Sequence, residues 1–164
     1  FQMEFSMDDI REVLDQSLRL NRYQANRRKI KLDVRCQVDP SVIEMDSSKI
    51  EQAITNLVSN AIEHSYPESE VIVTLLTEEG HLKFSVQDYG PGIPANEMSR
   101  LFKPYEKTSV KKIGGEKSTG LGMLITRKIV EGHNGTVDVQ SKLGEGTTIS
   151  FMFPLDRRIK TCTQ

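Results

Sequence analysis

The sequence predicts a single α/β domain, built as a two-layer α/β sandwich with a mixed, mostly antiparallel sheet covered by helices on one face. Segments with helical periodicity are interspersed with segments in which apolar residues alternate. Most of the alternating segments are joined by short turns, as in hairpins. The chain of 164 residues is also long enough to bury one substantial core.

A long helix and a strand open the chain. Apolar residues recur at three- and four-residue steps over 7–29, which predicts a helix with an inner face of Ile10, Val13, Leu14, Leu18 and Ala25. Residues 30–36 alternate strictly and predict a half-buried strand, one side of which carries Ile30, Leu32, Val34 and Cys36. A short strand over 42–45 is a candidate partner for it.

A second helix is expected over 46–64. Asp46 to Ser48 offer N-caps, and Glu51 is placed to complete a capping box with Ser48. Pro67 lies beyond the end of this helix. The predicted apolar face consists of Ile50, Ala53, Ile54, Leu57, Val58 and Ala61.

The rest of the chain continues the pattern, with strands expected over 71–77, 81–87, 136–141 and 147–153 and helices over 94–102 and 120–132. The first two strands flank "EEGH" and the last two flank "KLGEG", so we predict two hairpins. Residues 105–119 have little apolar content and predict a long mobile loop, which in a compact domain is usually functional or disordered. The residues after Pro154 form a polar tail.

Composition limits the classes of partner. Lys and Arg number 22 and Asp and Glu 23, so we expect no general attraction to nucleic acid or to an anionic membrane. No apolar run approaches the roughly 20 residues that cross a bilayer, and residues 1–9 do not resemble a signal peptide. Cys36 and Cys162 lack metal or disulfide spacing, which fits a reduced cytosol. Because Phe1 is not methionine, we expect a fragment or a processed chain.

Two asparagines mark the second helix. Asn56 and Asn60 lie four residues apart, so their side chains share one stripe, which borders the apolar face near His64. Amide oxygens at such a border can ligate Mg²⁺, which keeps several waters and takes few protein oxygens together with phosphates. The alternative is that both asparagines only solvate the edge of the helix.

The stretch "FSVQDYGPGIP" ends a strand on a carboxylate, Asp88, and then breaks into glycine and proline. A carboxylate accepts hydrogen bonds, so Asp88 suits an exocyclic amine such as that of adenine and would repel the keto oxygen of guanine. Gly90 and Gly92 have no Cβ, which would let a flat ring approach the backbone. Ile93 and Leu101 are candidates for an apolar wall. The alternative is an ordinary Asp-Gly turn.

Phosphate contacts are suggested by "STGLGMLITRKIV", which places Gly120 and Gly122 at a helix start, where free N–H groups and the helix dipole favour anions. The lysine-rich loop before it is interpreted as a flap over a triphosphate, or else as a solvated charged loop. In "GEGTT", the Thr147 hydroxyl either supports the base-binding carboxylate through water or only favours the strand. Each signal alone is weak, but together they predict one ATP pocket.

Five segments, in this order, carry a resemblance to a known family. "NLVSNAIEHS", "DYGPGI", "LFKPYEK", "STGLG" and "GEGTT" resemble the N box, first glycine box, F box, second glycine box and last glycine box of the GHKL (Bergerat-fold) ATP-binding domains. The chain is most similar to the catalytic domain of a two-component sensor histidine kinase, over about 6–154. This implies an ATP-binding kinase domain over 6–155 with a lid over 105–119, the end of an upstream linker over 1–5, and a polar tail over 156–164.

The resemblance also implies residue roles. Asn60 is expected to bind Mg²⁺ with Asn56 assisting, and these two are the expected catalytic residues. Asp88 is expected to bind the adenine amine. The implied nucleotide contacts are Asn60, His64, Asp88, Gly90, Gly92, Ile93, Leu101, Phe102, Lys107, Ser118, Thr119, Gly120, Leu121, Gly122 and Thr147.

One position separates the branches of this family. Members that hydrolyse ATP, and the anti-sigma serine kinases, carry a glutamate one turn before the metal-binding asparagine, where this chain has Asn56. An amide cannot act as a general base, so the resemblance implies transfer of the γ-phosphate of ATP to a histidine. The family's acceptor histidine lies beside an acid on a helical hairpin, and His64, His81 and His133 do not fit that pattern. We therefore expect the acceptor on an upstream domain.

The implied partners are an upstream dimerisation and histidine phosphotransfer domain and, through its phosphohistidine, a response regulator, with a cytoplasmic location. Two other functions stay open: a nucleotide-binding regulatory module without catalysis, and an ATP-hydrolysing clamp of the gyrase type. Glu63 would suit the silent module, because the family often has Lys or Arg at that position. Ser118 is a second departure, since many members carry glycine there.

Overall fold

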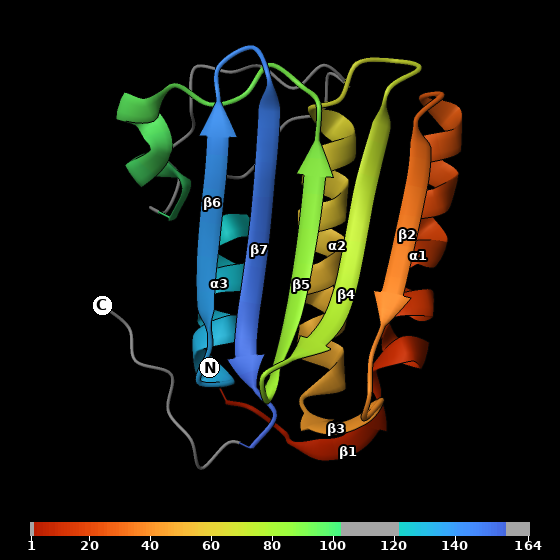
Figure 1. Cartoon of the computed structure of the whole chain (residues 1–164), viewed down its shortest axis with the longest axis vertical. Coiled ribbons are helices and arrows are strands. Elements are labelled where there is room, and N and C mark those ends of the chain that lie inside the picture. The colour runs from red at the N-terminus through yellow and green to blue at the C-terminus, as the bar shows by residue number, and fades with distance from the viewer. Residues whose placement is uncertain (1, 103–121, 157–164) are drawn as a thin grey trace.

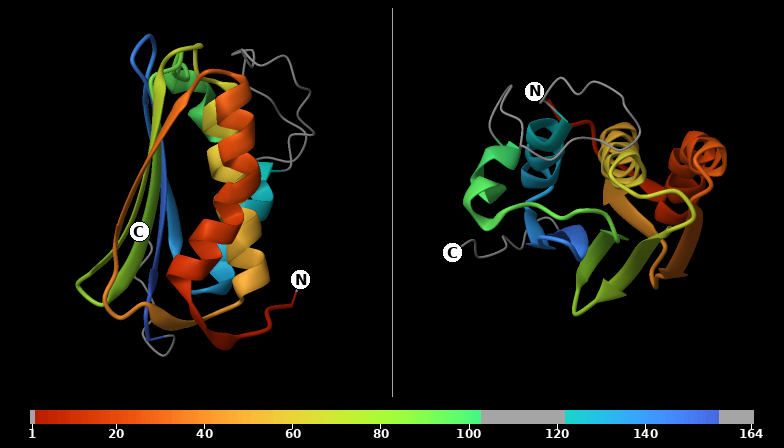
Figure 2. Two further views of the ribbon diagram at one scale, coloured as in Figure 1. Left: turned by 90° about the vertical axis from the view of Figure 1, so that its right-hand side faces the viewer. Right: turned by 90° about the horizontal axis from the view of Figure 1, so that it is seen from above.

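A five-stranded sheet forms one layer of the molecule, and α-helices cover one of its faces (Figures 1 and 2). The computed structural model describes residues 2–102 and 122–156. Their elements are, in order, β1 (Ser6–Asp9), α1 (Ile10–Arg27), β2 (Lys31–Gln37), β3 (Val42–Met45), α2 (Ser47–Glu63), β4 (Glu70–Glu78), β5 (His81–Asp88), the 3-10 helix η1 (Ala95–Phe102), α3 (Gly122–Gly132), β6 (Thr136–Lys142) and β7 (Gly146–Pro154). The predicted two-layer α/β sandwich is confirmed.

The strands of the large sheet lie in the order β2-β4-β5-β7-β6. β4 with β5, β5 with β7 and β6 with β7 are antiparallel pairs, whereas β2 and β4 are parallel. A parallel pair needs a long crossover, which α2 supplies, and the two predicted hairpins need only tight turns. The sheet is therefore mixed and mostly antiparallel, as predicted.

Two predictions about the N-terminal part are wrong. Residues Ser6–Asp9 form a strand instead of the first turn of a helix, and α1 begins at Ile10 with Asp9 as its N-cap. The short strand β3 pairs with β1 in a separate two-stranded sheet and not with the strand over 30–36. The helical periodicity starts only at Ile10. The strand after it finds its partner in β4, which lies far along the sequence and cannot be read from neighbouring residues.

The core lies between the helices and the inner face of the sheet. The predicted apolar face of α2 is buried, and it packs at the centre of the helical layer, between α1 and α3 (Figure 2). The sheet contributes alternate residues, all at most 4% exposed: Val71, Val73, Leu75, Leu82, Phe84, Val86, Ile149, Phe151 and Phe153. The Phe84 and Phe151 rings on neighbouring strands lie 5.1 Å apart. α2 is thus held at a fixed place over β5.

The first turn of α2 is fixed by a polar cluster. Asp46 is the N-cap: its Oδ1 accepts from Lys49 N at 3.1 Å and its Oδ2 accepts from Glu4 N at 2.8 Å. Asp46 N donates to Nε2 of the fully buried His133 at 3.0 Å, and Nδ1 of that ring donates to Ile129 O at 2.8 Å. Asp46 was one of the caps predicted, and Ser48 of the expected capping box lies inside the helix.

Several smaller predictions can also be compared with the structure. The short helix predicted over 94–102 is a 3-10 helix, and α2 ends at Glu63 with His64 as its C-cap. Cys36 is exposed and free, not half-buried as the alternation predicted, because it lies on the edge strand β2. The loop over 105–119, Cys162 and most of the polar tail lie outside the described residues. In the described part of the chain, no helix is long and apolar enough to cross a membrane.

Candidate functional site

The end of β5 is the centre of the candidate site. Asp88, the last residue of this strand, pairs in register with Val71 at the start of β4 and with Thr147 at the start of β7. The tip of β5, the turn between β6 and β7 and the C-terminal end of α2 gather at the same end of the molecule, which is uppermost in Figure 1. The strand ends on Asp88, as predicted, and this residue is only 6% exposed, so its carboxylate is buried at the end of a central strand.

Two backbone N–H groups hold the Asp88 carboxylate. Gly90 N donates to Oδ1 at 2.9 Å, and Thr147 N donates to the same oxygen at 3.3 Å. Among the described residues both donors therefore bind Oδ1, which leaves Oδ2 to accept from another group. The orientation of the carboxylate is set by the turn that follows it and by the neighbouring strand.

Burial raises the pKa of Asp88 above its ordinary value. The Gly90 N–H, the electrostatic effect of the nearby His64 and the Thr147 N–H each lower this pKa and offset part of the effect of burial. The net direction means that the ionised carboxylate is costly where it stands. An acid kept in an unfavourable place is a candidate functional group, since a purely structural role would favour a neutral side chain.

The turn after Asp88 packs against the last turn of α2. A Cβ on Gly90 would clash with the backbone carbonyl oxygen of His64, so glycine is required there. Gly92 has φ +75°, and a Cβ on it would clash with the carbonyl oxygen of Lys142. Both glycines are thus required by close approach to the protein's own backbone. Their predicted contact with a flat ring stays a prediction.

The turn between β6 and β7 contacts the other side of the same segment. Gly144 N donates to Pro91 O at 2.7 Å, and Ile93 N donates to Ser141 Oγ at 2.8 Å. Ser141 Oγ in turn lies 2.7 Å from Thr147 Oγ1. The Thr147 hydroxyl therefore faces Ser141, and it is the backbone N–H of Thr147 that supports Asp88. Sequence reasoning missed Ser141, because a serine near the end of a strand carries no specific signal.

α2 brings the predicted asparagines to this end of the molecule. Asn56 and Asn60 are half-buried on α2, one helical turn apart. The Asn60 carbonyl oxygen accepts from His64 N at 3.1 Å and from His64 Nδ1 at 2.8 Å. Because the His64 carbonyl packs on Gly90, the last turn of α2 contacts the turn that follows Asp88. Glu63, in that same helical turn, is buried.

The remaining predicted residues are placed only in part. Leu101 and Phe102 are half-buried on η1, and the Arg127 guanidinium of α3 lies over the Phe102 ring, 5.5 Å from its centre. Gly122 is the first residue of α3. Five predicted contacts lie outside the described residues: Lys107, Ser118, Thr119, Gly120 and Leu121.

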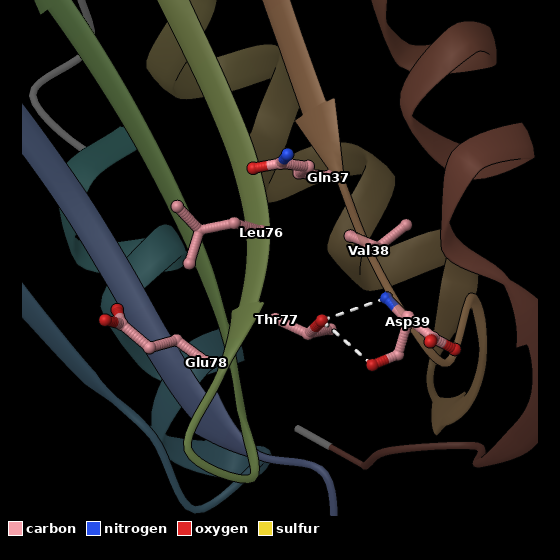
Figure 3. Close-up of a pocket in the computed structure, with 6 residues that line it drawn as sticks. All are labelled: Gln37, Val38, Asp39, Leu76, Thr77 and Glu78. Carbon is pink, nitrogen blue, oxygen red and sulfur yellow. Dashed lines mark hydrogen bonds between the residues drawn. The ribbon is translucent and has the colours of Figure 1, made fainter.

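An open pocket of about 580 Å³ lies elsewhere (Figure 3). It is lined by Gln37, Val38, Asp39, Leu76, Thr77 and Glu78. Thr77 Oγ1 accepts from Asp39 N at 2.9 Å and donates to Asp39 O at 3.0 Å, which ties the end of β4 to the loop after β2. Asp88 pairs with the opposite end of β4, so this pocket is not part of the candidate site.

Histidine kinases are among the proteins to which this chain is similar. Residues 45–157 match the family model described as histidine kinase-, DNA gyrase B-, and HSP90-like ATPase. Histidine protein kinase DivJ of Caulobacter vibrioides is 32% identical over 160 residues, covering 94% of this chain and 26% of DivJ. Sensor histidine kinase ZraS of Klebsiella oxytoca is 32% identical over 160 residues, covering 96% and 33%. The chain thus spans between about a quarter and a third of the length of these curated relatives.

Solved structures of histidine kinases are also similar to this chain. The catalytic domain of histidine kinase ThkA aligns with TM-score 0.78 and 27% identity, covering 95% of this chain and 99% of that one. Full-length ShkA, solved in complex with AMPPNP, aligns with TM-score 0.81 and 25% identity, covering 94% and 32%. The predicted fold, that of histidine kinase ATP-binding domains, is confirmed.

The raised pKa of Asp88 predicts a pH dependence of stability without nucleotide. Between the ordinary value of 3.8 and the folded pKa, the folded state binds more protons than the unfolded chain. The stability contribution of the protonated carboxyl is therefore full below about pH 3.8 and is lost as the pH rises through the folded pKa. Asp88→Asn keeps an oxygen for Gly90 N and Thr147 N and has no charge. At pH values above the folded pKa of Asp88, we expect this variant to be at least as stable as the parent.

Urea denaturation of both proteins at a series of pH values measures this effect. The advantage of the asparagine variant should shrink as the pH falls towards 3.8. Asp138→Asn, at an exposed position on β6, is the matched control and should show no such trend. An Asp88→Asn variant that is less stable at neutral pH and recovers in acid would mean that the carboxylate stabilises the fold.

Proposed function

We propose a function that follows from family membership and from the chemistry of the site. The chain belongs to the histidine kinase-, DNA gyrase B-, and HSP90-like ATPase family. In our proposal it binds ATP with Mg²⁺ and delivers the γ-phosphate to a histidine on a separate helical-hairpin domain. The observation that carries the proposal is the buried Asp88 carboxylate: two N–H groups bind one of its oxygens, and no donor from the described residues binds the other.

The adenine end of the site is assigned to Asp88. The 6-amino group of adenine donates a hydrogen bond that an ionised carboxylate can accept, whereas the keto oxygen of guanine cannot donate. Burial strengthens such a bond, because water competes less for the carboxylate. Nucleotide binding would also offset the cost of keeping the charge buried. Adenine selectivity therefore follows from the position of one side chain.

The metal end is assigned to Asn60, with Asn56 assisting. Their half-buried carboxamides lie one turn apart on α2 and offer the oxygen ligands that Mg²⁺ prefers. Residues 2–102 and 122–156 contain no group of three or more His, Cys, Asp or Glu side chains that could hold a metal ion. This donor set fits an ion that takes few protein ligands and relies on phosphates and water. Mg²⁺ bound there would neutralise charge on the phosphates during transfer.

The acceptor is assigned to another domain. His133 is fully buried with both ring nitrogens hydrogen-bonded to backbone atoms, and His81 is the first residue of β5, at the opposite end of the strand from Asp88. In the transfer, the bond between the γ-phosphorus and the oxygen bridging to the β-phosphate breaks, ADP leaves, and a bond from phosphorus to an imidazole nitrogen forms. The attacking nitrogen is the unprotonated one of a neutral imidazole, and the proton on the other ring nitrogen passes to a base beside the acceptor. The task of this chain is to position and neutralise the phosphates.

Partners and location follow from the same proposal. An upstream dimerisation and phosphotransfer domain would supply the acceptor, a response regulator would take the phosphoryl group, and the chain would act in the cytosol. Residues 1–5 are proposed as the end of the linker to that domain. Within it, Glu4 N donates to the N-cap Asp46, so this segment is tied to the start of α2. The buried Glu63 favours one alternative, a nucleotide-binding module without transfer.

The metal assignment predicts the effect of Asn60→Ala. Losing an oxygen ligand should remove most of the Mg²⁺ dependence of ATP binding, a weakening of Mg²⁺ affinity on the order of 10-fold or more, with the fold intact. Magnesium titrations by calorimetry, at fixed ATP, measure it. Asn56→Ala should act in the same direction but less, and Asn26→Ala, at an exposed position on α1, is the control. Unchanged titrations for Asn60→Ala would place the ligand elsewhere.

The reaction itself is tested with labelled ATP. Alone, the chain should bind ATP but neither label itself stably nor hydrolyse ATP quickly, because Asn56 cannot activate water and His64, His81 and His133 do not match the acceptor pattern of a histidine beside an acid on a helical hairpin. Adding the upstream hairpin, joined or separate, should yield a phosphoramidate that is labile in acid and stable in base. Rapid hydrolysis by the chain alone would favour the ATP-hydrolysing clamp. No label with the hairpin present would favour the silent module.

A further inference from the structure

A side chain from α1 binds the end of α2. Arg28, the C-cap residue of α1, donates from Nη1 to Ile62 O and from Nη2 to Ser65 O, the latter at 3.0 Å. These carbonyls belong to residues on either side of His64, the C-cap of α2. One guanidinium therefore spans the point where α2 ends and the chain turns towards β4.

The end of α2 has a particular need for such a cation. The last carbonyl groups of a helix have no partner within the helix, and they form the negative end of its dipole. The last turn of α2 contains no basic residue, and Glu63 adds an acid to it. Arg28 supplies donors from a neighbouring helix to Ile62 O, which also accepts from Ser65 N at 3.2 Å, and to Ser65 O just beyond the helix end. Its planar fork suits two acceptors better than a single ammonium would.

His64 lies between the two carbonyls that Arg28 binds, and the turn that follows Asp88 packs against it. The His64 carbonyl oxygen is the atom against which Gly90 packs so closely that a Cβ would clash. Gly90 N donates to Asp88 Oδ1 at 2.9 Å. Arg28 is thus linked to the carboxylate in three steps. It forms two hydrogen bonds on either side of His64, the His64 carbonyl contacts Gly90, and Gly90 N bonds Asp88 Oδ1.

Other bonds join the same two junctions without Arg28. Glu68 N donates to Lys29 O at 2.8 Å, and Lys31 N donates to Ser69 O at 3.0 Å. These main-chain bonds hold the ends of the loops together whatever residue stands at position 28. Removing the guanidinium should therefore loosen the position of His64 more than it weakens the fold.

We propose that Arg28 is a positioning residue for the adenine end of the site. It fixes the last turn of α2, and through the His64 carbonyl it fixes the Gly90 turn and the direction of the Asp88 carboxylate. Arg28 binds carbonyl groups of the protein and does not itself contact the carboxylate in this path. The inference rests on the proposed function, since it assumes that Asp88 reads the base.

The test compares binding of ATP and GTP, with Mg²⁺, by the parent and by Arg28→Ala and Arg28→Lys. We expect Arg28→Ala to weaken ATP binding by about 3- to 30-fold and to reduce the preference for ATP over GTP. Arg28→Lys should be intermediate, because one ammonium cannot span both carbonyls as the fork does. Arg22→Ala, at an exposed position on the same helix, is the matched control and should bind as the parent does.

Coupling to Gly90 separates positioning from general destabilisation. Gly90→Ala should also weaken ATP binding, and the double variant with Arg28→Ala should lose less than the product of the two single effects. A lower melting temperature for Arg28→Ala with an unchanged ATP to GTP ratio would overturn the inference. If Arg28→Ala does not fold, an Arg28→Lys variant with the parental ratio overturns it equally. A parent without preference for ATP would instead refute the proposed function.

Discussion

The buried charge of Asp88 is the constraint on which the rest of the site depends. An ionised carboxylate buried at the end of a central strand is unfavourable, and backbone N–H groups brought to it offset part of the cost. Here one donor comes from the turn that follows the strand and one from the neighbouring strand β7. The segments around the carboxylate also pack closely, because a Cβ on Gly90 would clash with His64 O, one on Gly92 with Lys142 O and one on Gly146 with Asp88 O. The buried acid therefore lies among glycines that the close backbone packing requires.

α2 connects this constraint to the rest of the molecule. Its first turn is held by the Asp46 cap and by His133, whose ring bonds backbone atoms on both sides. Its last turn is held by Arg28. Between these ends, a buried apolar face keeps the helix over the sheet. Asn56 and Asn60 on the edge of this face therefore have a fixed position relative to the end of β5. A site that α2 and β5 share requires such a fixed position.

Local sequence patterns predicted much of this arrangement, but not the contacts between distant segments. The hairpins, the α2 face and the strand that ends on Asp88 follow from periodicity and turn residues, and the five motifs predicted the fold. The pairing of β1 with β3 could not be predicted, because four-residue strands carry almost no pattern. Nor could the Arg28 contacts, which join residues 34 and 37 positions apart. The predicted approach of a flat ring to Gly90 and Gly92 stays a prediction, and the atoms that exclude a Cβ at these two positions are the protein's own carbonyl oxygens.

Base recognition by Asp88 is tested most directly by calorimetry of ATP and inosine triphosphate binding to the unmodified chain with Mg²⁺. The two nucleotides differ at position 6 of the purine, where one has an amine and the other a keto oxygen, and at the adjacent N1, which carries a hydrogen only in inosine. A hydrogen bond to a charged group contributes about 1.5–3 kcal/mol, so ATP should bind roughly 10- to 100-fold more tightly. Equal affinities would contradict recognition of the amine by the buried carboxylate.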